Sequence, residues 1–166
     1  MATENNNPEW GFGTKAVHAG QRPDPVTGAV TVPVYQTSTY QQDAVGQDRG
    51  YEYSRTGNPT RSALEISIAA LEGAKFGRAF ASGMAAEDTI LRLLDPGDHV
   101  IMGNDAYGGT FRLISKVLTR FGISYSSTNL SNPDEVKAAF KDKTKMIWAE
   151  TPTNPLLSVV DIELLA

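Results

Sequence analysis

Apolar positions are distributed unevenly along this chain, and their spacing changes near Thr60. Residues 1–59 are rich in Asn, Gln, Gly, Pro, Thr and Tyr, with short apolar pieces such as AVTVPVYQTSTY and little helical periodicity. So few core-forming residues predict an extended arm over 1–59, either disordered or ordered by lying on another surface. Its aromatic side chains favour the second interpretation: Tyr35, Tyr40, Tyr51 and Tyr53.

From residue 60 onward, segments of helical spacing alternate with short apolar runs. The pattern predicts helices over 60–73, 82–94, 108–121 and 131–140, strands over 76–81, 99–104, 123–129 and 144–150, and a helix that begins within the final VDIELLA. Thr60 and Asn132 are the expected N-caps of two of these helices, and Pro133 suits a first helical position. This alternation predicts an α/β fold, with a mostly parallel sheet covered by helices on both faces.

In such a sheet, ligands bind beyond the carboxyl ends of the strands. The loops after Ala81, Asn104 and Glu150 are therefore the places where we expect a site.

Composition narrows the function further. The 166 residues fit one ordinary domain, and a net charge of -4 without a polybasic run argues against a nucleic-acid role. There are no cysteines, so disulfides and thiolate chemistry are excluded, and the distant pair His18 and His99 makes a weak case for metal. The sequence shows neither a signal-peptide pattern nor a run of about 20 apolar residues. We interpret the protein as cytoplasmic.

The segment FASGMAAE joins a predicted strand to a helix through small residues. The backbone N–H groups of Gly83 and Met84 can converge on an anion there, and Ser82 can both cap the helix and donate to an oxygen. This pattern predicts a phosphate site, although it matches neither the nucleoside-triphosphate loop nor the dinucleotide fingerprint. A plain capped turn is the alternative.

Two further strand-end loops offer complementary groups. In NDAYGGTFR, the ring of Tyr107 is placed to cover a planar ligand, and Arg112 to reach a carboxylate. In WAETPTNP, two X-Pro steps hold Asn154, whose amide can donate to a phenolate oxygen. Each feature alone is compatible with packing or turn formation. Together the three loops predict a site for a phosphorylated planar aromatic ligand, to which Tyr53 and Arg55 of the arm could add phosphate contacts.

Four motifs, YEYSRTGNPTR, FASGMAAE, DAYGGTFR and ETPTNPLL, in this order and at these separations, resemble the cystathionine synthase and lyase family of pyridoxal-phosphate enzymes in Cys/Met metabolism. The resemblance runs from about Lys15 to Ala166. It implies pyridoxal 5'-phosphate (PLP) as the cofactor, the large domain of a fold-type I PLP transferase, and a homotetramer whose active sites are shared between subunits. Residues 1–59 would be the arm that contacts a neighbouring subunit, and residues 60–166 the first part of the PLP-binding domain.

The resemblance also implies roles for the matching positions. Tyr53 and Arg55 would bind the cofactor phosphate of a neighbouring subunit, while Ser82, Gly83 and Met84 would bind the phosphate of their own. Tyr107 would stack on the pyridine ring and help to move protons, and Asn154 would donate to the O3' oxygen of that ring. Glu52 and Arg112 would lie near the distal part of the amino-acid substrate.

The chain departs from the family pattern in what it lacks. Neither the Ser-Xaa-Thr-Lys context of the lysine that binds the cofactor covalently nor the Asp-Asn-Thr motif occurs, and the substrate-binding arginine of the family's C-terminal domain is absent too. The lysines present lie in the arm, in predicted loops or on helical faces: Lys15, Lys75, Lys116, Lys137, Lys141, Lys143 and Lys145. We therefore expect this chain alone to be inactive, either as a truncated enzyme or as the partner of a second chain that carries the lysine.

Within the family, the resemblance favours a cystathionine gamma-synthase, which joins O-succinyl- or O-acetylhomoserine to cysteine. Cystathionine gamma-lyase, O-acetylhomoserine sulfhydrylase and methionine gamma-lyase remain alternatives, and Glu52 suits recognition of the distal ammonium of cystathionine. From other classes, a non-catalytic oligomerisation or phosphate-binding module remains possible, whereas the missing glycine fingerprint argues against a dinucleotide-dependent oxidoreductase.

Overall fold

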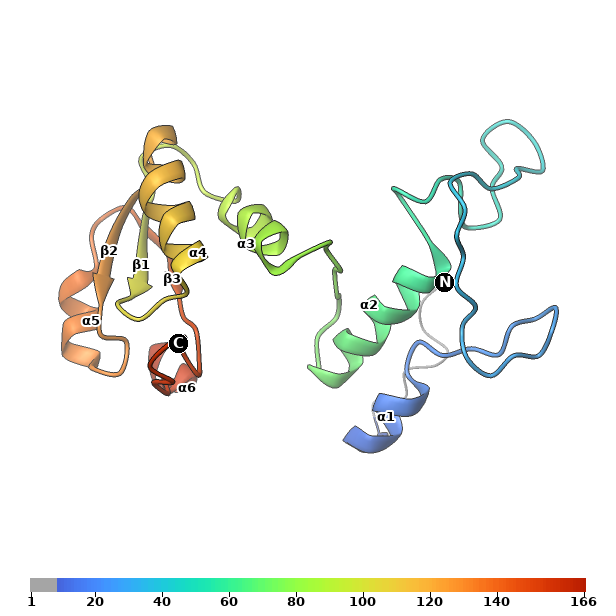
Figure 1. Cartoon of the computed structure of the whole chain (residues 1–166), viewed down its shortest axis with the longest axis horizontal. Helices are drawn as coiled ribbons and strands as arrows, with labels where there is room; N and C mark the ends of the chain where they lie inside the picture. The colour runs from blue at the N-terminus through green and yellow to red at the C-terminus, as the bar shows by residue number, and fades with distance from the viewer. Residues whose placement is uncertain (1–8) are drawn as a thin grey trace. The chain divides into compact units, whose positions relative to one another are not determined.

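A computed structural model describes residues 9–166 of the chain (Figure 1). The chain divides into two compact units, with the boundary between Ala79 and Phe80. The sequence pattern predicts a boundary near residue 59 instead. The helix that begins there groups with the N-terminal unit because it packs against α1 (Phe12–His18).

The first unit contains two helices, α1 and α2 (Pro59–Leu71), and long connecting segments. Where the chain leaves α1, Gly20 lies against α2 with a φ of 75°, and a β-carbon there would lie 2.4 Å from the carbonyl oxygen of Ala63. Glycine is required on both counts, because an L side chain would be strained in this conformation and would also collide with the helix.

Residues 19–58 contain little regular structure, but they are locally ordered. Around an isolated antiparallel bridge between Thr39 and Tyr53, the N–H of Tyr40 donates to the carbonyl of Glu52 at 3.1 Å, and the N–H of Ser54 donates to that of Ser38 at 2.8 Å. The segment that carries Glu52 and Tyr53 is therefore paired to an earlier part of the same arm.

Helix α2 begins one residue earlier than the sequence pattern predicts, and the expected cap at Thr60 is wrong. The side chain of Asn58 accepts hydrogen bonds from the N–H groups of Thr60 and Arg61, with Pro59 in the first turn. The hydroxyl of Thr60 instead donates to the carbonyl of Pro33 at 2.8 Å. Asn58 also donates to the carbonyl of Tyr35, so the TGNPT turn ties the arm to the start of α2.

The second unit is built on a parallel sheet with the strand order β2-β1-β3. Its strands are β1 (His99–Gly103), β2 (Ser124–Thr128) and β3 (Thr144–Trp148), close to the predicted ranges. The strand predicted over 76–81 is wrong: this segment has no regular secondary structure and does not pair with any strand in the described residues. Without a neighbour to complete a ladder of hydrogen bonds, its apolar residues do not form a strand.

Helices cover both faces of this sheet. On one side lie α3 (Gly83–Leu91) and the helical segment that starts at α4 (Gly108–Arg112); on the other lie α5 (Pro133–Ala139) and α6 (Ile162–Leu165). The sequence pattern predicts that the segment from the start of α4 to residue 121 is one helix. It instead passes into a π-helical turn, η1 (Leu113–Val117), and a 3-10 turn, η2 (Leu118–Phe121). Asn132 caps α5 with Pro133 in the first turn, as predicted.

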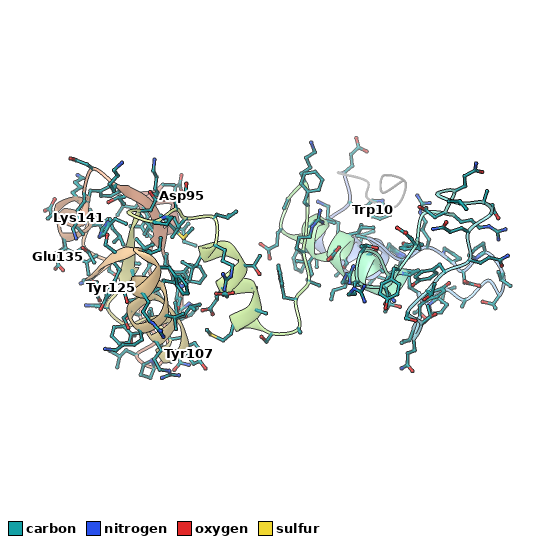
Figure 2. All side chains as sticks on the ribbon, turned by 90° about the horizontal axis from the view of Figure 1, so that it is seen from above. Trp10, Asp95, Tyr107, Tyr125, Glu135 and Lys141 are labelled. Carbon is teal, nitrogen blue, oxygen red and sulfur yellow. The ribbon has the colours of Figure 1, made fainter. Side chains whose placement is uncertain are left out.

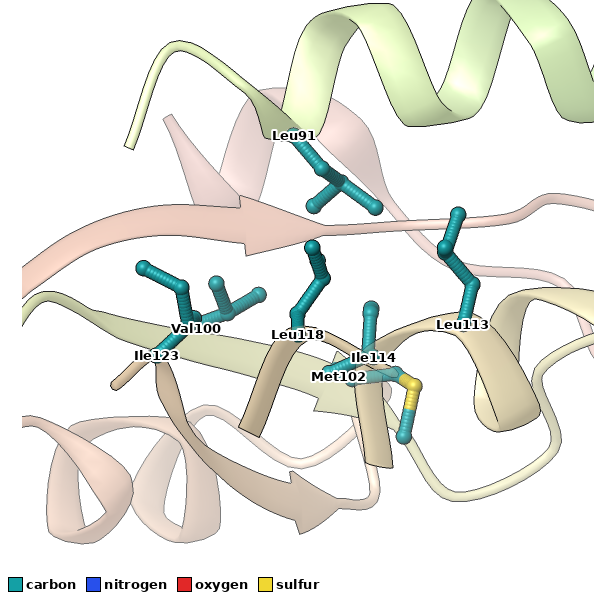
Figure 3. Close-up of a cluster of buried hydrophobic side chains, with 7 residues drawn as sticks. All are labelled: Leu91, Val100, Met102, Leu113, Ile114, Leu118 and Ile123. Atoms are coloured by element: carbon teal, nitrogen blue, oxygen red, sulfur yellow. The ribbon is translucent and has the colours of Figure 1, made fainter. Parts of the chain in front are cut away.

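The buried residues of β1 divide the core into two clusters because successive side chains of a strand point to opposite faces. Val100 and Met102 face the cluster shown in Figure 3. Its remaining members are Leu91, Leu113, Ile114, Leu118 and Ile123. Ile101 faces the other way, where it packs with Leu130, Val136 and Val160. This two-sided α/β core confirms the predicted fold class for residues 80–166.

None of the helices in the part of the chain that the structure describes is long and apolar enough to span a membrane.

Candidate functional site

The carboxyl ends of β1 and β3 lie side by side, since Met102 is paired with Trp148 in the parallel register. The loops that follow these strands carry Tyr107 and Asn154, two of the residues predicted to bind a ligand. Both loops, together with the start of α3, belong to the second unit.

The start of α3 has the form expected of an anion site. The Ser82 hydroxyl oxygen accepts a hydrogen bond from the N–H of Ala85 at 3.1 Å, so Ser82 is the N-cap. Within residues 9–166, the N–H groups of Gly83 and Met84 have no acceptor, and no atom would lie within 4 Å of a β-carbon added to Gly83. Two free amides at the positive end of a helix dipole, with open space beside them, suit a phosphate.

Tyr107 lies next to this helix start, and Gly109 is the point of contact. A β-carbon on Gly109 would lie 2.3 Å from Cε1 of Tyr107 and 2.9 Å from Sδ of Met84. The ring of Tyr107 therefore folds over the backbone of Gly109, beside a residue of the predicted phosphate site. Tyr107 as a residue is 44% exposed and lies at the surface of the second unit (Figure 2), which leaves room for a planar ligand beside its ring.

A partly buried hydrogen bond supports this arrangement. The hydroxyl of Thr110, which is fully buried, donates to Oε2 of Glu87 at 2.8 Å. Since Thr110 belongs to α4 and Glu87 to α3, the bond holds the two helices together close to Met84 and Tyr107. No local pattern in the sequence indicates a role for either residue.

Two carboxylates connect the loops after β1 and β3. Glu150 accepts a hydrogen bond from the backbone N–H of Tyr107 at 2.8 Å. Asp105 accepts one from the hydroxyl of the buried Thr153, the residue directly before Asn154. The only signal for these two carboxylates in the sequence is their place at, or directly after, the ends of predicted strands.

Asn154 and Arg112 are both exposed. Arg112 folds back toward the start of its helix, because its Nη1 atom lies 3.3 Å from the position of a β-carbon on Gly108. Its guanidinium is thus directed to the start of α4, where Tyr107 also lies. Among the described residues it has no carboxylate partner.

The arm residues lie in the first unit. The guanidinium of Arg55 sits 4.1 Å above the ring centroid of Tyr53, so the two residues predicted to bind phosphate are in contact. Arg61 of α2 donates to the carbonyls of Ser54 and Arg55, at 3.1 and 3.3 Å, which fixes the backbone beneath this pair. Glu52 is exposed. Arg61 ends the YEYSRTGNPTR motif, but its role could not be read from the motif.

Residues 9–166 contain no group of three or more His, Cys, Asp or Glu side chains arranged to hold a metal ion.

Comparison with known proteins shows the family of the chain. The family model described as "Cys/Met metabolism PLP-dependent enzyme" matches residues 13–166, nearly the whole chain. The chain belongs to this family. Its cofactor is PLP, and the free amides of α3 together with the exposed ring of Tyr107 fit the phosphate and the pyridine ring of that molecule.

Relatives within the Cys/Met metabolism family carry different activities in their names. The chain is 60% identical to a cystathionine gamma-synthase of Mycobacterium tuberculosis over 94% of its length. It is 58% identical to a cystathionine beta-lyase of Lactococcus lactis over 90% of its length. The solved structure of a cystathionine gamma-lyase from Lactobacillus plantarum, complexed with L-serine, matches 94% of the chain with a TM-score of 0.89 and 50% identity.

The chain spans only part of each of these proteins: 41% of the gamma-synthase, 40% of the beta-lyase and 41% of the gamma-lyase chain. The family and the partial α/β fold are therefore established, whereas the activity of a complete protein is a matter for proposal.

Proposed function

We propose that this chain forms the N-terminal part of a cystathionine gamma-synthase, which joins O-succinyl- or O-acetylhomoserine to cysteine. The observation that carries the proposal is that the ring of Tyr107 and the side chain of Met84 meet over Gly109, at the start of the helix whose Gly83 and Met84 amides are free. The 60% identity to a mycobacterial gamma-synthase is compatible with this activity, and the 58% identity to a beta-lyase makes a direct assay necessary.

In this proposal the residues of the second unit bind and orient the cofactor. The amides of Gly83 and Met84, with Ser82, hold the phosphate, and the face of Tyr107 covers the pyridine ring. The phenol group of Tyr107 accepts and returns a proton close to the reacting carbon, and the amide of Asn154 donates to the O3' oxygen. PLP supplies an electron sink that stabilises negative charge on the substrate carbon.

The arm completes a second site. Tyr53 and Arg55 reach the cofactor phosphate of a neighbouring subunit in a homotetramer, and Glu52 and Arg112 lie near the distal group of the substrate. The contact between Arg55 and the ring of Tyr53, and the support that Arg61 gives to their backbone, favour this role because they preorganise a cation at an otherwise exposed turn.

We also propose that residues 1–166 are inactive without the rest of the enzyme, whether that lies on the same chain or on a second one. The chemistry needs a lysine at the site. In the second unit, Lys141, Lys143 and Lys145 lie before or within the first half of β3, away from its carboxyl end. The other two lysines of this unit are on helical segments, Lys116 in η1 and Lys137 in α5.

A gamma-lyase is the main alternative, supported by the similarity to the Lactobacillus plantarum structure. The Lactococcus relatives add a beta-lyase, which cleaves the other carbon–sulfur bond of cystathionine. O-acetylhomoserine sulfhydrylase and methionine gamma-lyase activities stay open as well. A non-catalytic phosphate-binding module is the alternative from a different class.

Assays on the full-length protein distinguish these activities. We expect the protein to bind PLP with visible absorbance, and to form cystathionine from an O-acylhomoserine and cysteine faster than it cleaves cystathionine. If the protein cleaved cystathionine faster than it formed it, the proposed synthase activity would be wrong and a lyase activity correct. The keto acid released would then identify which carbon–sulfur bond breaks. PLP binding by residues 1–166 alone, with no turnover in the full-length protein, would support the module.

A further inference from the structure

The loops after β1 and β3 are joined by two carboxylates, each of which accepts hydrogen bonds from the opposite loop. Asp105, in the loop after β1, accepts hydrogen bonds from two groups of the other loop, the Thr153 hydroxyl and, at 3.2 Å, the N–H of Leu156. These two donors lie on either side of Asn154. Asp105 therefore fixes the segment that presents the Asn154 amide.

Glu150 makes the reverse connection, from the end of β3 to the loop after β1. Its Oε2 atom accepts the backbone N–H of Tyr107 at 2.8 Å, and its Oε1 atom accepts Nε1–H of Trp148 at 3.2 Å. Because both carboxylate oxygens are engaged, the side chain has one orientation. Glu150, at the start of the loop that carries Asn154, therefore fixes the backbone of Tyr107.

The hydrogen-bond partners of Asp105 and Glu150 indicate that these carboxylates position the two loops. Neither Asp105 nor Glu150 forms an ion pair within residues 9–166; their donors are two backbone amides, a hydroxyl and an indole. Both side chains are partly buried and line a small pocket between the two loops. A partly buried carboxylate that accepts from neutral donors forms charge-assisted hydrogen bonds, which constrain geometry more than neutral ones do.

The ring of Tyr107 has little freedom once its backbone is fixed. It lies against Gly109, beside Met84, so a shift of the Tyr107 backbone would move the ring relative to the amides of α3. Asn154 depends on Asp105 in the same way, since the donors are Thr153, directly before it, and Leu156, two residues after it.

We propose that Asp105 and Glu150 are a reciprocal pair of positioning residues, which set the distance between the ring of Tyr107 and the amide of Asn154. The inference rests on the proposed PLP function. Neither carboxylate is assigned a contact with the cofactor: Glu150 acts through Tyr107, and Asp105 acts through the segment around Asn154.

The test uses the full-length protein with PLP as the probe, and two readouts. Glu150→Gln should weaken PLP binding about tenfold and alter the visible circular dichroism of bound PLP, because a hydrogen bond to a charged acceptor is replaced by a weaker one. Without PLP, the Tyr107 amide should exchange its hydrogen faster in Glu150→Gln and faster still in Glu150→Ala. Asp105→Asn should weaken PLP binding, and should leave the rate of amide hydrogen exchange at Tyr107 close to that of the wild type.

Asp88→Asn is the matched control. It removes another carboxylate of the same unit, which pairs with Arg92 on an exposed helical face and touches neither loop. PLP affinity and the visible signal should stay at wild-type values. An effect as large as that of Glu150→Gln would overturn the proposal, because it would show that general destabilisation is enough.

A double-mutant cycle separates positioning from a general effect on folding. In a Tyr107→Ala background, the backbone N–H remains but the ring is gone, so Glu150→Gln should change PLP affinity less than twofold. An equal loss in both backgrounds, or unchanged PLP affinity together with unchanged amide exchange in the single variant, would overturn the proposal. Failure of the wild-type protein to bind PLP would instead reject the proposed function. If the wild-type protein did not bind PLP but Glu150→Gln still exchanged the Tyr107 amide faster, the hydrogen bond between Glu150 and Tyr107 would be established. The proposed role of that bond in PLP binding would be overturned.

Discussion

Gly109 illustrates how the site depends on a single missing side chain. Its backbone is crossed by the ring of Tyr107, and a β-carbon would collide with both Tyr107 and Met84. We predict that Gly109→Ala displaces the ring and weakens PLP binding about tenfold or more, since a packed ring cannot move without losing contacts. Equilibrium titration of PLP into the full-length variant measures the loss.

Gly108→Ala is the control for this prediction. A β-carbon at Gly108 would meet only Nη1 of Arg112, at 3.3 Å, and this is the end of a flexible side chain. PLP affinity should therefore stay within about twofold of wild type. If the two variants lost affinity equally, steric displacement of Tyr107 would not be the cause.

His99 links stability to pH from a buried position at the start of β1. Its ring bonds to the hydroxyls of Thr144 on β3, at 2.8 Å, and Ser126 on β2, at 3.0 Å, so it bridges all three strands. Burial lowers the pKa of His99 below its ordinary value of 6.5, and the positive charge of Lys141 lowers that pKa further. The folded chain therefore binds the proton less readily than the unfolded chain.

The sign of the pH effect follows. Well above pH 6.5 the histidine is neutral in both states and has no effect on stability. As the pH falls through 6.5, the unfolded state takes up the proton first and is increasingly favoured, until the pH passes the lower pKa of the folded state. We predict that the free energy of unfolding falls by on the order of 1 kcal/mol between pH 7 and pH 5. Urea unfolding across this range measures it, with His99→Gln as reference. A slope identical in the variant would assign the loss to carboxylates instead.

Residues of the candidate site differ in how far the sequence predicts them. Ser82 was predicted as a cap because a small polar residue between a strand and a helix has a local physical role. The roles of Asp105, Glu150 and Arg61 are not predicted, because their partners lie several to about 50 residues away in sequence. No local rule pairs a charged side chain with a backbone group at such a distance. Such contacts become visible only once the loops are brought together.

At the scale of elements, the two Asn-Pro helix starts allow a direct comparison. The side chain of Asn132 caps α5 and, within residues 9–166, otherwise donates only to Glu135 of the same helix. The side chain of Asn58 caps α2 and also donates to the carbonyl of Tyr35 in the arm. We predict that Asn132→Ala costs about 1 kcal/mol of stability, and that Asn58→Ala costs about 2 kcal/mol, because it also leaves a partly buried carbonyl without its donor.

Thermal unfolding of the two variants checks this comparison, and Asn58→Asp refines it. The aspartate keeps the cap but loses the donor, so its cost should lie between those of wild type and Asn58→Ala. Equal costs for Asn58→Ala and Asn132→Ala would show that the bond to Tyr35 contributes little.

The errors at this scale have a common cause. The segment 76–81 has the composition of a strand, but a strand also needs a neighbour, and the three-stranded sheet of residues 80–166 does not provide one. The predicted helix over 108–121 is periodic throughout, yet its backbone leaves α-helical geometry at Leu113, where two buried side chains, Leu113 and Ile114, meet the core. Local pattern fixes the type of an element, and tertiary packing decides whether and how regularly it forms.

At the scale of the whole molecule, the apolar surface of the arm is informative. Val26, Val34 and Phe12 are each more than 70% exposed, although the arm contains few apolar residues to begin with. Large apolar side chains left in water are characteristic of surfaces that contact another part of a protein or another subunit. This exposure supports the proposal that the arm lies on a neighbouring subunit and that Arg55 serves the site of that subunit.

Subunit mixing tests this proposal. Arg55→Ala removes the cation offered to a neighbour, and Tyr107→Ala removes the ring of a subunit's own site, so homotetramers of either variant should have little activity. In mixed tetramers, a site whose arm comes from the Tyr107→Ala subunit and whose ring comes from the Arg55→Ala subunit is intact. About one site in four should be of this kind if the subunits assemble at random, so we expect roughly a quarter of wild-type activity after co-refolding. If Arg55 acted within its own subunit, every mixed site would lack one of the two groups, and mixing would restore nothing.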